Sequence, residues 1–200
     1  KLNITENCLD RHIPTKGHLP ALIWEPNAPD ENGRVLTYSK LLEKVCQFAQ
    51  VLKNNGVQKG DRVCIYMGMI PELAIAVLAC ARIGAIHSVV FGGFASHSLA
   101  TRIDDAKPKM IVTAEAGMRG GKAVPYKPLL DEAIALASYK PEKVLIVNRG
   151  LSEFTTVAGR DLDYATERQK HLNDLVPIEW VDATHPSYIL YTSGTTGKPK

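Results

Sequence analysis

The chain has 200 residues and is 45% hydrophobic, which is enough to form one large domain with its own core. Its formal net charge is +3 and its basic residues are spread along the chain, so nothing indicates nucleic acid or a membrane surface as a partner. No apolar run reaches the roughly 18 residues that span a bilayer, and the first 20 residues are polar and broken by Pro14 and Pro20, unlike a signal peptide.

The four cysteines lie at positions 8, 46, 64 and 80, with no closely spaced pair. This pattern favours free thiols in a reducing compartment over disulfides or a zinc site, and so predicts a cytoplasmic protein. Cys64 and Cys80 lie in apolar surroundings and are expected to be inert core residues.

Residues 1–20 form a lead-in segment that is irregular or contains short helical turns. Strands at 21–25 and 35–38 flank a loop rich in Pro, Asn, Asp and Gly, which predicts a hairpin. Thr37 or Ser39 can cap the following helix, which ends at Asn55-Gly56. Its buried face is predicted from apolar residues at helical spacing, namely Leu41, Leu42, Val45, Phe48, Ala49 and Leu52.

Strands and helices then alternate. The predicted strands are 62–67, 85–90, 110–114 and 143–147, and the predicted helices are 71–83, 96–105 with Ser96 as cap, and 128–138. The region 150–186 is polar, with a possible helix at 161–171 and Trp180 as an anchor to the core. This order predicts an α/β fold, with a mostly parallel sheet covered by helices on both faces. Ligands of such sheets bind beyond the carboxyl ends of the strands.

The last stretch begins with a predicted buried strand at 187–191 and continues as Thr192, Ser193, Gly194, Thr195, Thr196, Gly197 and Lys198. Two glycines, four hydroxyls and a lysine are suited to holding a polyphosphate. The spacing differs from a Walker A loop, which has four residues between its last two glycines and a hydroxyl residue after the lysine. The alternative interpretation is a polar surface turn. The chain starts at Lys1 and stops three residues after Gly197, so we expect a piece of a longer protein.

Two more loops follow consecutive strands and could line one surface. Phe91-Gly92-Gly93 offers an exposed backbone beside aromatic rings, or is a tight turn with Phe91 and Phe94 in the core. Arg119-Gly120-Gly121-Lys122 places two cations around a flexible diglycine that could grip a phosphate, or is a solvated loop.

Other polar residues carry less weight. The six histidines show neither metal spacing nor a paired nucleophile; His87 is expected to be a satisfied core histidine and His97 a solvated one. No Gly-x-Ser-x-Gly elbow surrounds Ser193, and Asp104-Asp105 is expected to be a surface feature rather than a metal site.

The segment Tyr191–Lys200 resembles the phosphate-binding signature of the acyl-adenylate-forming (AMP-binding) enzymes, and within them the chain resembles short-chain acyl-CoA synthetases. Residues 78–95 are a long match to acetyl- and propionyl-CoA synthetases, and residues 3–12 match their early segment. Segments 103–108, 119–122 and 124–127 look closer to the propionyl enzymes. The resemblance covers essentially all of the chain, which would be the N-terminal portion of the AMP-binding domain.

This resemblance implies ATP, Mg²⁺ and coenzyme A as ligands and a short-chain carboxylate as substrate. A carboxylate would attack ATP to give acyl-adenylate and pyrophosphate, and the thiol of coenzyme A would then release AMP. By resemblance, residues 192–198 hold the ATP phosphates, whereas Phe91, Gly92, Gly93, Arg119, Gly120, Gly121 and Lys122 bind coenzyme A. Lys122 departs from the arginine usual in acetyl enzymes and loses its two-pronged grip on phosphate.

The family's catalytic lysine, acyl pocket and adenine contacts would lie beyond Lys200, so no catalytic residue is expected here and the chain alone should be inactive. Propionate is the expected substrate of the whole protein, and acetate is the nearest rival. The competing classes are a non-catalytic nucleotide- or CoA-binding module and a structural fragment without ligand.

Overall fold

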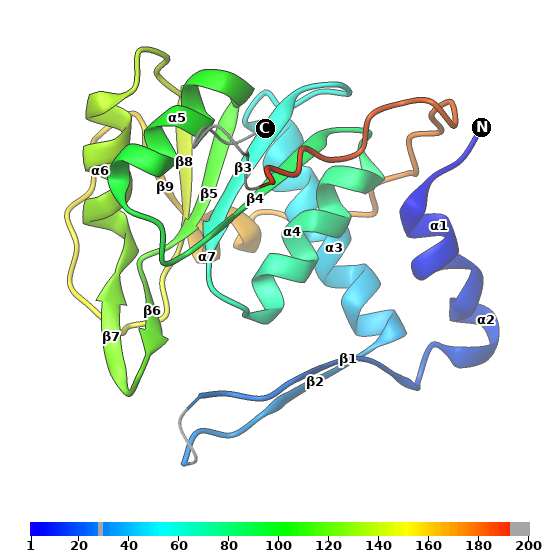
Figure 1. Ribbon diagram of the computed structural model, residues 1–200. Helices are drawn as coiled ribbons and strands as arrows, with labels where there is room; N and C mark the ends of the chain where they lie inside the picture. Colours follow the sequence, from blue (N-terminus) through cyan, green and yellow to red (C-terminus); the bar gives the residue numbers. More distant parts are fainter. Residues whose placement is uncertain (28–29, 193–200) are drawn as a thin grey trace.

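A parallel five-stranded sheet organises the fold (Figure 1). The computed structural model describes residues 1–27 and 30–192. Neighbouring strands are all parallel in the order β4-β3-β5-β8-β9. The strands are β3 (Arg62–Met67), β4 (Ile86–Phe91), β5 (Met110–Ala114), β8 (Lys143–Val147) and β9 (Asp161–Asp163). β5 is buried throughout, as a strand covered on both faces must be, so the predicted α/β sheet is confirmed.

Helices cover both faces of this sheet (Figure 1). α4 (Pro71–Arg82) connects β3 to β4 and packs on α3 (Tyr38–Asn54). α5 (Ser96–Ala106) and α6 (Tyr126–Leu136) pack against each other on the opposite face. The two layers follow from right-handed crossovers, because the chain first steps from β3 to β4 on one side and then returns to β5 on the other.

Helix α3 forms as its sequence predicts. The Thr37 hydroxyl accepts a hydrogen bond from the Lys40 amide at 3.2 Å, and the helix ends before Asn55, with Gly56 at φ +86°. The predicted apolar face is buried except for Leu42, which is partly buried and packs against the core.

Of the two alternatives for the lead-in segment, the structure shows the short helical turns. It contains α1 (Ile4–Cys8), the 3-10 helix η1 (Asp10–His12) and α2 (Ile13–Lys16), followed by the hairpin of β1 (Pro20–Trp24) and β2 (Arg34–Thr37). The nearly buried guanidinium of Arg82 donates to both Asp10 carboxylate oxygens, at 2.9 and 3.0 Å, and to the Val176 carbonyl at 2.6 Å. This bidentate ion pair fixes the lead-in to the end of α4.

Two predictions for the region 150–186 are wrong. The single helix expected at 161–171 is instead β9 followed by α7 (Tyr164–Gln169), because the Asp163 side chain caps α7 by accepting from the Thr166 amide at 2.7 Å. Trp180 is 47% exposed and does not anchor the region to the core.

The predicted buried strand at 187–191 is also wrong. Tyr188 forms only an isolated parallel bridge with His87, and the side chains of Tyr188 and Leu190 are 60% and 66% exposed. The segment runs beside β4, which is one of the two edge strands of the sheet in the described part of the chain, and it adds no full strand to that sheet.

The cysteines are free, as predicted: Cys8 is exposed, and Cys46, Cys64 and Cys80 are buried. Burial raises the pKa of the Cys64 and Cys80 thiols to about 12, which makes them unreactive. Across residues 1–27 and 30–192, no helix is both long and apolar enough to cross a membrane.

Candidate functional site

The carboxyl ends of three neighbouring strands meet at one level of the sheet. The register pairs Met67 of β3 with Phe91 of β4, and Tyr66 of β3 with Thr113 of β5. A cavity of about 220 Å³ opens there, and its lining includes residues 68–70 after β3, residues 91–93 at the end of β4 and just beyond it, and residues 117–119 beyond β5. Strand order reverses around β3, and such reversals are where open α/β sheets bind ligands.

The side chain of Tyr66 supports the turn that follows β4. The Tyr66 hydroxyl donates to the Phe94 carbonyl at 3.0 Å, and burial together with the neighbouring Tyr126 raises the pKa of Tyr66 to about 12. Phe91 and Phe94 meet edge to face at 6.1 Å but are 58% and 37% exposed, so neither is a core residue. The interpretation of this turn with both phenylalanines in the core is therefore wrong, and Phe91, Gly92 and Gly93 line the cavity.

Tyr126 explains two glycines of the site. A Cβ on Gly92 would lie 2.6 Å from Cζ of Tyr126, and one on Gly117 would lie 2.5 Å from the same atom. The ring is only 6% exposed and also packs against Tyr66, with the centroids 5.4 Å apart. Only glycine lets both backbone segments approach this ring.

The predicted flexible loop at 119–122 is a β-hairpin, which corrects that interpretation. Its strands are β6 (Ala116–Arg119) and β7 (Lys122–Pro125), and Gly120 and Gly121 form the turn with φ of +56° and +75°. Two consecutive positive φ angles fit the twist of a tight hairpin and favour glycine. Arg119 lines the cavity, with Nη1 3.0 Å from the position of a Gly93 Cβ. Gly120, Gly121 and Lys122 are exposed at the tip and do not line the cavity.

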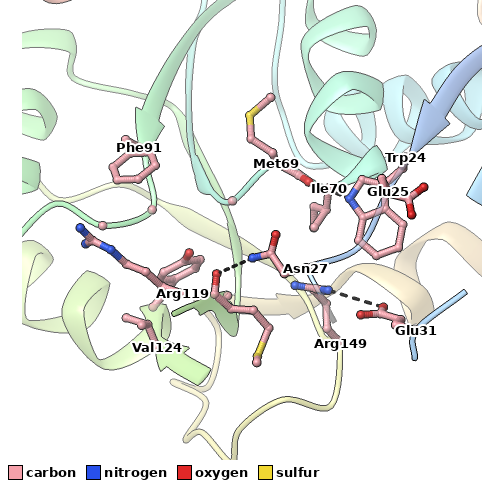
Figure 2. Close-up of a pocket in the computed structure, with 16 residues that line it drawn as sticks. Trp24, Glu25, Asn27, Glu31, Met69, Ile70, Phe91, Arg119, Val124 and Arg149 are labelled. Carbon is pink, nitrogen blue, oxygen red and sulfur yellow. Dashed lines mark hydrogen bonds and ion pairs between the residues drawn. The ribbon is translucent and has the colours of Figure 1, made fainter. Parts of the chain in front are cut away.

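Three further residues at the cavity come from distant parts of the sequence (Figure 2). The Trp24 indole N–H donates to the Met69 carbonyl at 2.8 Å, and the Asn27 amide donates to the Met118 carbonyl at 3.0 Å. The guanidinium of Arg149 lies 5.9 Å from the centre of the Trp24 ring. These residues belong to no motif, so the sequence gives no signal for them except the Trp-containing strand of the predicted hairpin.

Two guanidinium groups, those of Arg119 and Arg149, and two carboxylates line the cavity. Burial raises the pKa of Tyr126, whereas the nearby charges of Arg149 and Arg119 act in the opposite direction. The lining carboxylates, Glu25 and Glu31, belong to solvent-exposed residues. Aromatic faces, exposed backbone and two guanidinium groups suit a ligand that carries a flat ring and phosphate groups.

The predicted ATP loop lies almost entirely outside the described residues. Only Thr192 is described, and it is exposed; Ser193, Gly194, Thr195, Thr196, Gly197 and Lys198 are not. The preceding Tyr191 is fixed, since its hydroxyl donates to Asp105 at 2.6 Å. Burial and this hydrogen bond raise the pKa of Tyr191. Arg102 stacks on both Tyr191, at 5.2 Å, and Phe94, at 4.5 Å, and so links this segment to the turn after β4.

The remaining histidines and acidic residues considered as site candidates lie outside the cavity. Among residues 1–27 and 30–192, no three His, Cys, Asp or Glu side chains are grouped to hold a metal ion. His97 is exposed and Asp104 accepts from the Tyr139 amide at 2.7 Å, as expected for surface residues. His87 is not the satisfied histidine predicted, because its Nδ1 is buried without a partner in the described structure. Burial lowers the pKa of His87, and its ring stacks on Tyr188.

Comparison with known proteins adds to this geometry. A family model described as "AMP-binding enzyme" matches residues 9–200. The chain is 56% identical over 198 residues to a propionate–CoA ligase from Salmonella typhimurium, which covers 99% of this chain and 31% of that protein. Identity to a propionate–CoA ligase from Escherichia coli is 52%, over 100% of this chain and 32% of that protein.

Acetyl-CoA synthetases follow closely. One from Xanthobacter autotrophicus is 50% identical over 99% of this chain and 30% of its own length. The chain thus spans under a third of the length of these relatives. The solved structure of acetoacetyl-CoA synthetase from Streptomyces lividans superposes with a TM-score of 0.86 at 29% identity, over 99% of this chain and 29% of that one.

Proposed function

This chain belongs to the family of AMP-binding enzymes, and from this premise we propose that it is the N-terminal part of the AMP-binding domain of a propionate–CoA ligase. Residues 1–20 are the lead-in segment, and residues 192–198 are the phosphate-binding loop. The full-length protein joins a short-chain carboxylate to coenzyme A at the expense of ATP. The relatives named propionate–CoA ligase, at 56% and 52% identity along the whole chain, support this substrate.

The proposed reaction has two steps. A carboxylate oxygen attacks the α-phosphorus of ATP, and pyrophosphate leaves as the acyl-adenylate forms. The sulfur of coenzyme A then attacks the acyl carbon, the bond to AMP breaks, and acyl-CoA is released. The loop at 192–198 would bind the leaving phosphates through backbone amides, hydroxyls and the Lys198 ammonium.

The single observation that supports this function best is the convergence at the cavity. The family resemblance assigns Phe91, Gly92, Gly93 and Arg119 to coenzyme A from two separate segments, and these residues line one cavity at the carboxyl ends of β4 and β5. In this proposal the cavity holds the nucleotide end of coenzyme A. Gly120, Gly121 and Lys122 would act from the exposed hairpin tip rather than from the wall.

Mg²⁺ remains a prediction from the family resemblance, where it would neutralise the ATP phosphates. The described residues contain no cluster of three candidate ligands for it. A cytoplasmic location is part of the same proposal and rests on the four free cysteines.

The test is product analysis with the full-length protein, ATP and coenzyme A. We expect equal amounts of AMP, pyrophosphate and acyl-CoA, with a higher kcat/KM for propionate than for acetate. A higher value for acetate would favour the acetate–CoA ligase alternative, which the acetyl-CoA synthetase relatives support. Binding of ATP and coenzyme A without product would instead support a non-catalytic module.

A further inference from the structure

We propose that Arg149 is a further coenzyme A-binding residue of this cavity: its guanidinium binds a phosphate group of the ligand, and the buried carboxylate of Glu115 positions it. The inference rests on the proposed function of the cavity as the coenzyme A site.

Among the described residues, the guanidinium of Arg149 has only one counter-ion, and it lies at the limit of an ion pair. Its side chain is only 17% exposed, and Glu31 Oε1, at 4.0 Å, is the one carboxylate oxygen within that distance among the described residues. Glu31 is itself 44% exposed, and a pair at this separation gains little. No described residue accepts a hydrogen bond from this guanidinium, although hydrogen bonding is how mostly buried cations are normally stabilised. An incoming phosphate, which matches the planar donor fork of arginine, would supply that partner.

The buried side chain of Glu115 fixes the position of the loop that carries Arg149. Its carboxylate is completely buried; Oε2 accepts from the Arg149 amide and Oε1 from the Leu151 amide, both at 2.8 Å. The backbone of Glu115 also accepts from the amides of Tyr126, at 2.8 Å, and Lys127. One residue at the end of β5 therefore fixes the loop after β8 and the start of α6, both of which face the cavity. Charge-assisted bonds of this kind are stronger than neutral ones.

The two arginines stand at different ends of the cavity. Figure 2 shows Phe91 and Arg119 at one end and Trp24 and Arg149 at the other, with Asn27 between them. Coenzyme A carries a diphosphate and a separate 3′-phosphate. Two guanidinium groups at different ends of the cavity match a ligand with two separated phosphate groups.

The experiment measures KM for coenzyme A in the full-length protein. Arg149→Ala should raise it about 10- to 100-fold, as expected for loss of a hydrogen bond between charged groups. Arg149→Lys keeps the positive charge but loses the planar donor fork, so its KM for coenzyme A should lie between the values of wild type and Arg149→Ala. Arg11→Ala is the matched control, because Arg11 is exposed on the lead-in segment, away from the cavity, and its removal changes net charge equally. Carboxylate-dependent ATP–pyrophosphate exchange, which needs no coenzyme A, reports whether each variant is folded.

Glu115→Gln tests the positioning role. An amide group keeps only one of the two acceptor oxygens, so KM for coenzyme A should rise about 3- to 10-fold while saturating coenzyme A restores turnover. A purely structural role would instead lower exchange activity and turnover together, without this change in KM, and would overturn the positioning claim.

Arg119→Ala separates this inference from the proposed function. If Arg119→Ala raises KM for coenzyme A and both Arg149 variants do not, the inference fails and the proposed site stands. If none of these variants changes KM for coenzyme A, the cavity is not the coenzyme A site and both fail.

Discussion

Replacing Gly117 or Gly92 by alanine should disrupt the cavity, because the added methyl group would clash with Tyr126. The new Cβ would lie 2.5 Å or 2.6 Å from Tyr126 Cζ, which is far inside van der Waals contact. The ring is buried against Tyr66 and cannot swing into solvent without opening the site.

Overpacking of this kind destabilises by about 1–3 kcal/mol. For a unit of this size, that corresponds to a fall in unfolding temperature of about 2–12 °C. Because Gly92 and Gly117 also line the cavity, KM for coenzyme A should rise in the same variants. The assays are thermal unfolding and steady-state kinetics on the full-length protein.

Gly68→Ala is the matched control, because its Cβ would meet the same tyrosine at an ordinary 3.4 Å. It should leave the unfolding temperature close to wild type. Tyr126→Leu combined with Gly117→Ala should recover part of the loss, with a coupling of about 0.5–3 kcal/mol. Equal effects of Gly68→Ala and Gly117→Ala, or no coupling to Tyr126, would refute the reasoning.

Three further predictions concern one buried ion pair and two contacts of the site. Burial alone would raise the pKa of Asp161, but hydrogen bonds from cations including Lys127, at 2.9 Å, lower it overall. Its stabilisation is therefore present above the unfolded pKa of about 3.9 and is lost as pH falls through the lower folded value. Asp161→Asn should cost about 3 kcal/mol at neutral pH and flatten the acid limb of urea midpoints measured between pH 6 and 3. Tyr66→Phe removes the hydrogen bond to the Phe94 carbonyl and should lower the free energy of unfolding by about 1 kcal/mol. It should also raise KM for coenzyme A a few-fold. An unchanged KM would show that the turn keeps its conformation without this hydrogen bond. Arg102→Met removes the cation shared by two rings and should raise KM for both ATP and coenzyme A, whereas a change in only one would contradict the link.

Much of the fold follows from local pattern. Continuous apolar strands separated by helices predicted the parallel sheet, and the buried face of α3 follows from its spacing of apolar residues. Predictions failed where tertiary placement decides. The segment at 187–191 has a strand-like composition, but it lies beside an edge strand and stays half exposed. Asp163 divided a predicted helix by capping its second half.

The residues of the candidate site were also predicted only in part. Phe91, Gly92, Gly93 and Arg119 could be named from the sequence because glycine-containing segments after predicted strands made them candidates and the family resemblance assigns them to coenzyme A. Trp24, Asn27 and Arg149 could not, since the hydrogen bonds and packing that bring them to the cavity join segments far apart in the chain. The hairpin form of residues 116–125 was also missed, although two adjacent glycines are a typical turn signal.

Hydrogen–deuterium exchange with each ligand in turn tests the central claim most directly, that this cavity binds coenzyme A. The full-length protein is compared with ATP alone and with coenzyme A alone. We predict that coenzyme A protects the amides of residues 91–95 and 116–125, and that ATP does not. Unchanged exchange in both segments under saturating coenzyme A, or protection there by ATP alone, would contradict the account.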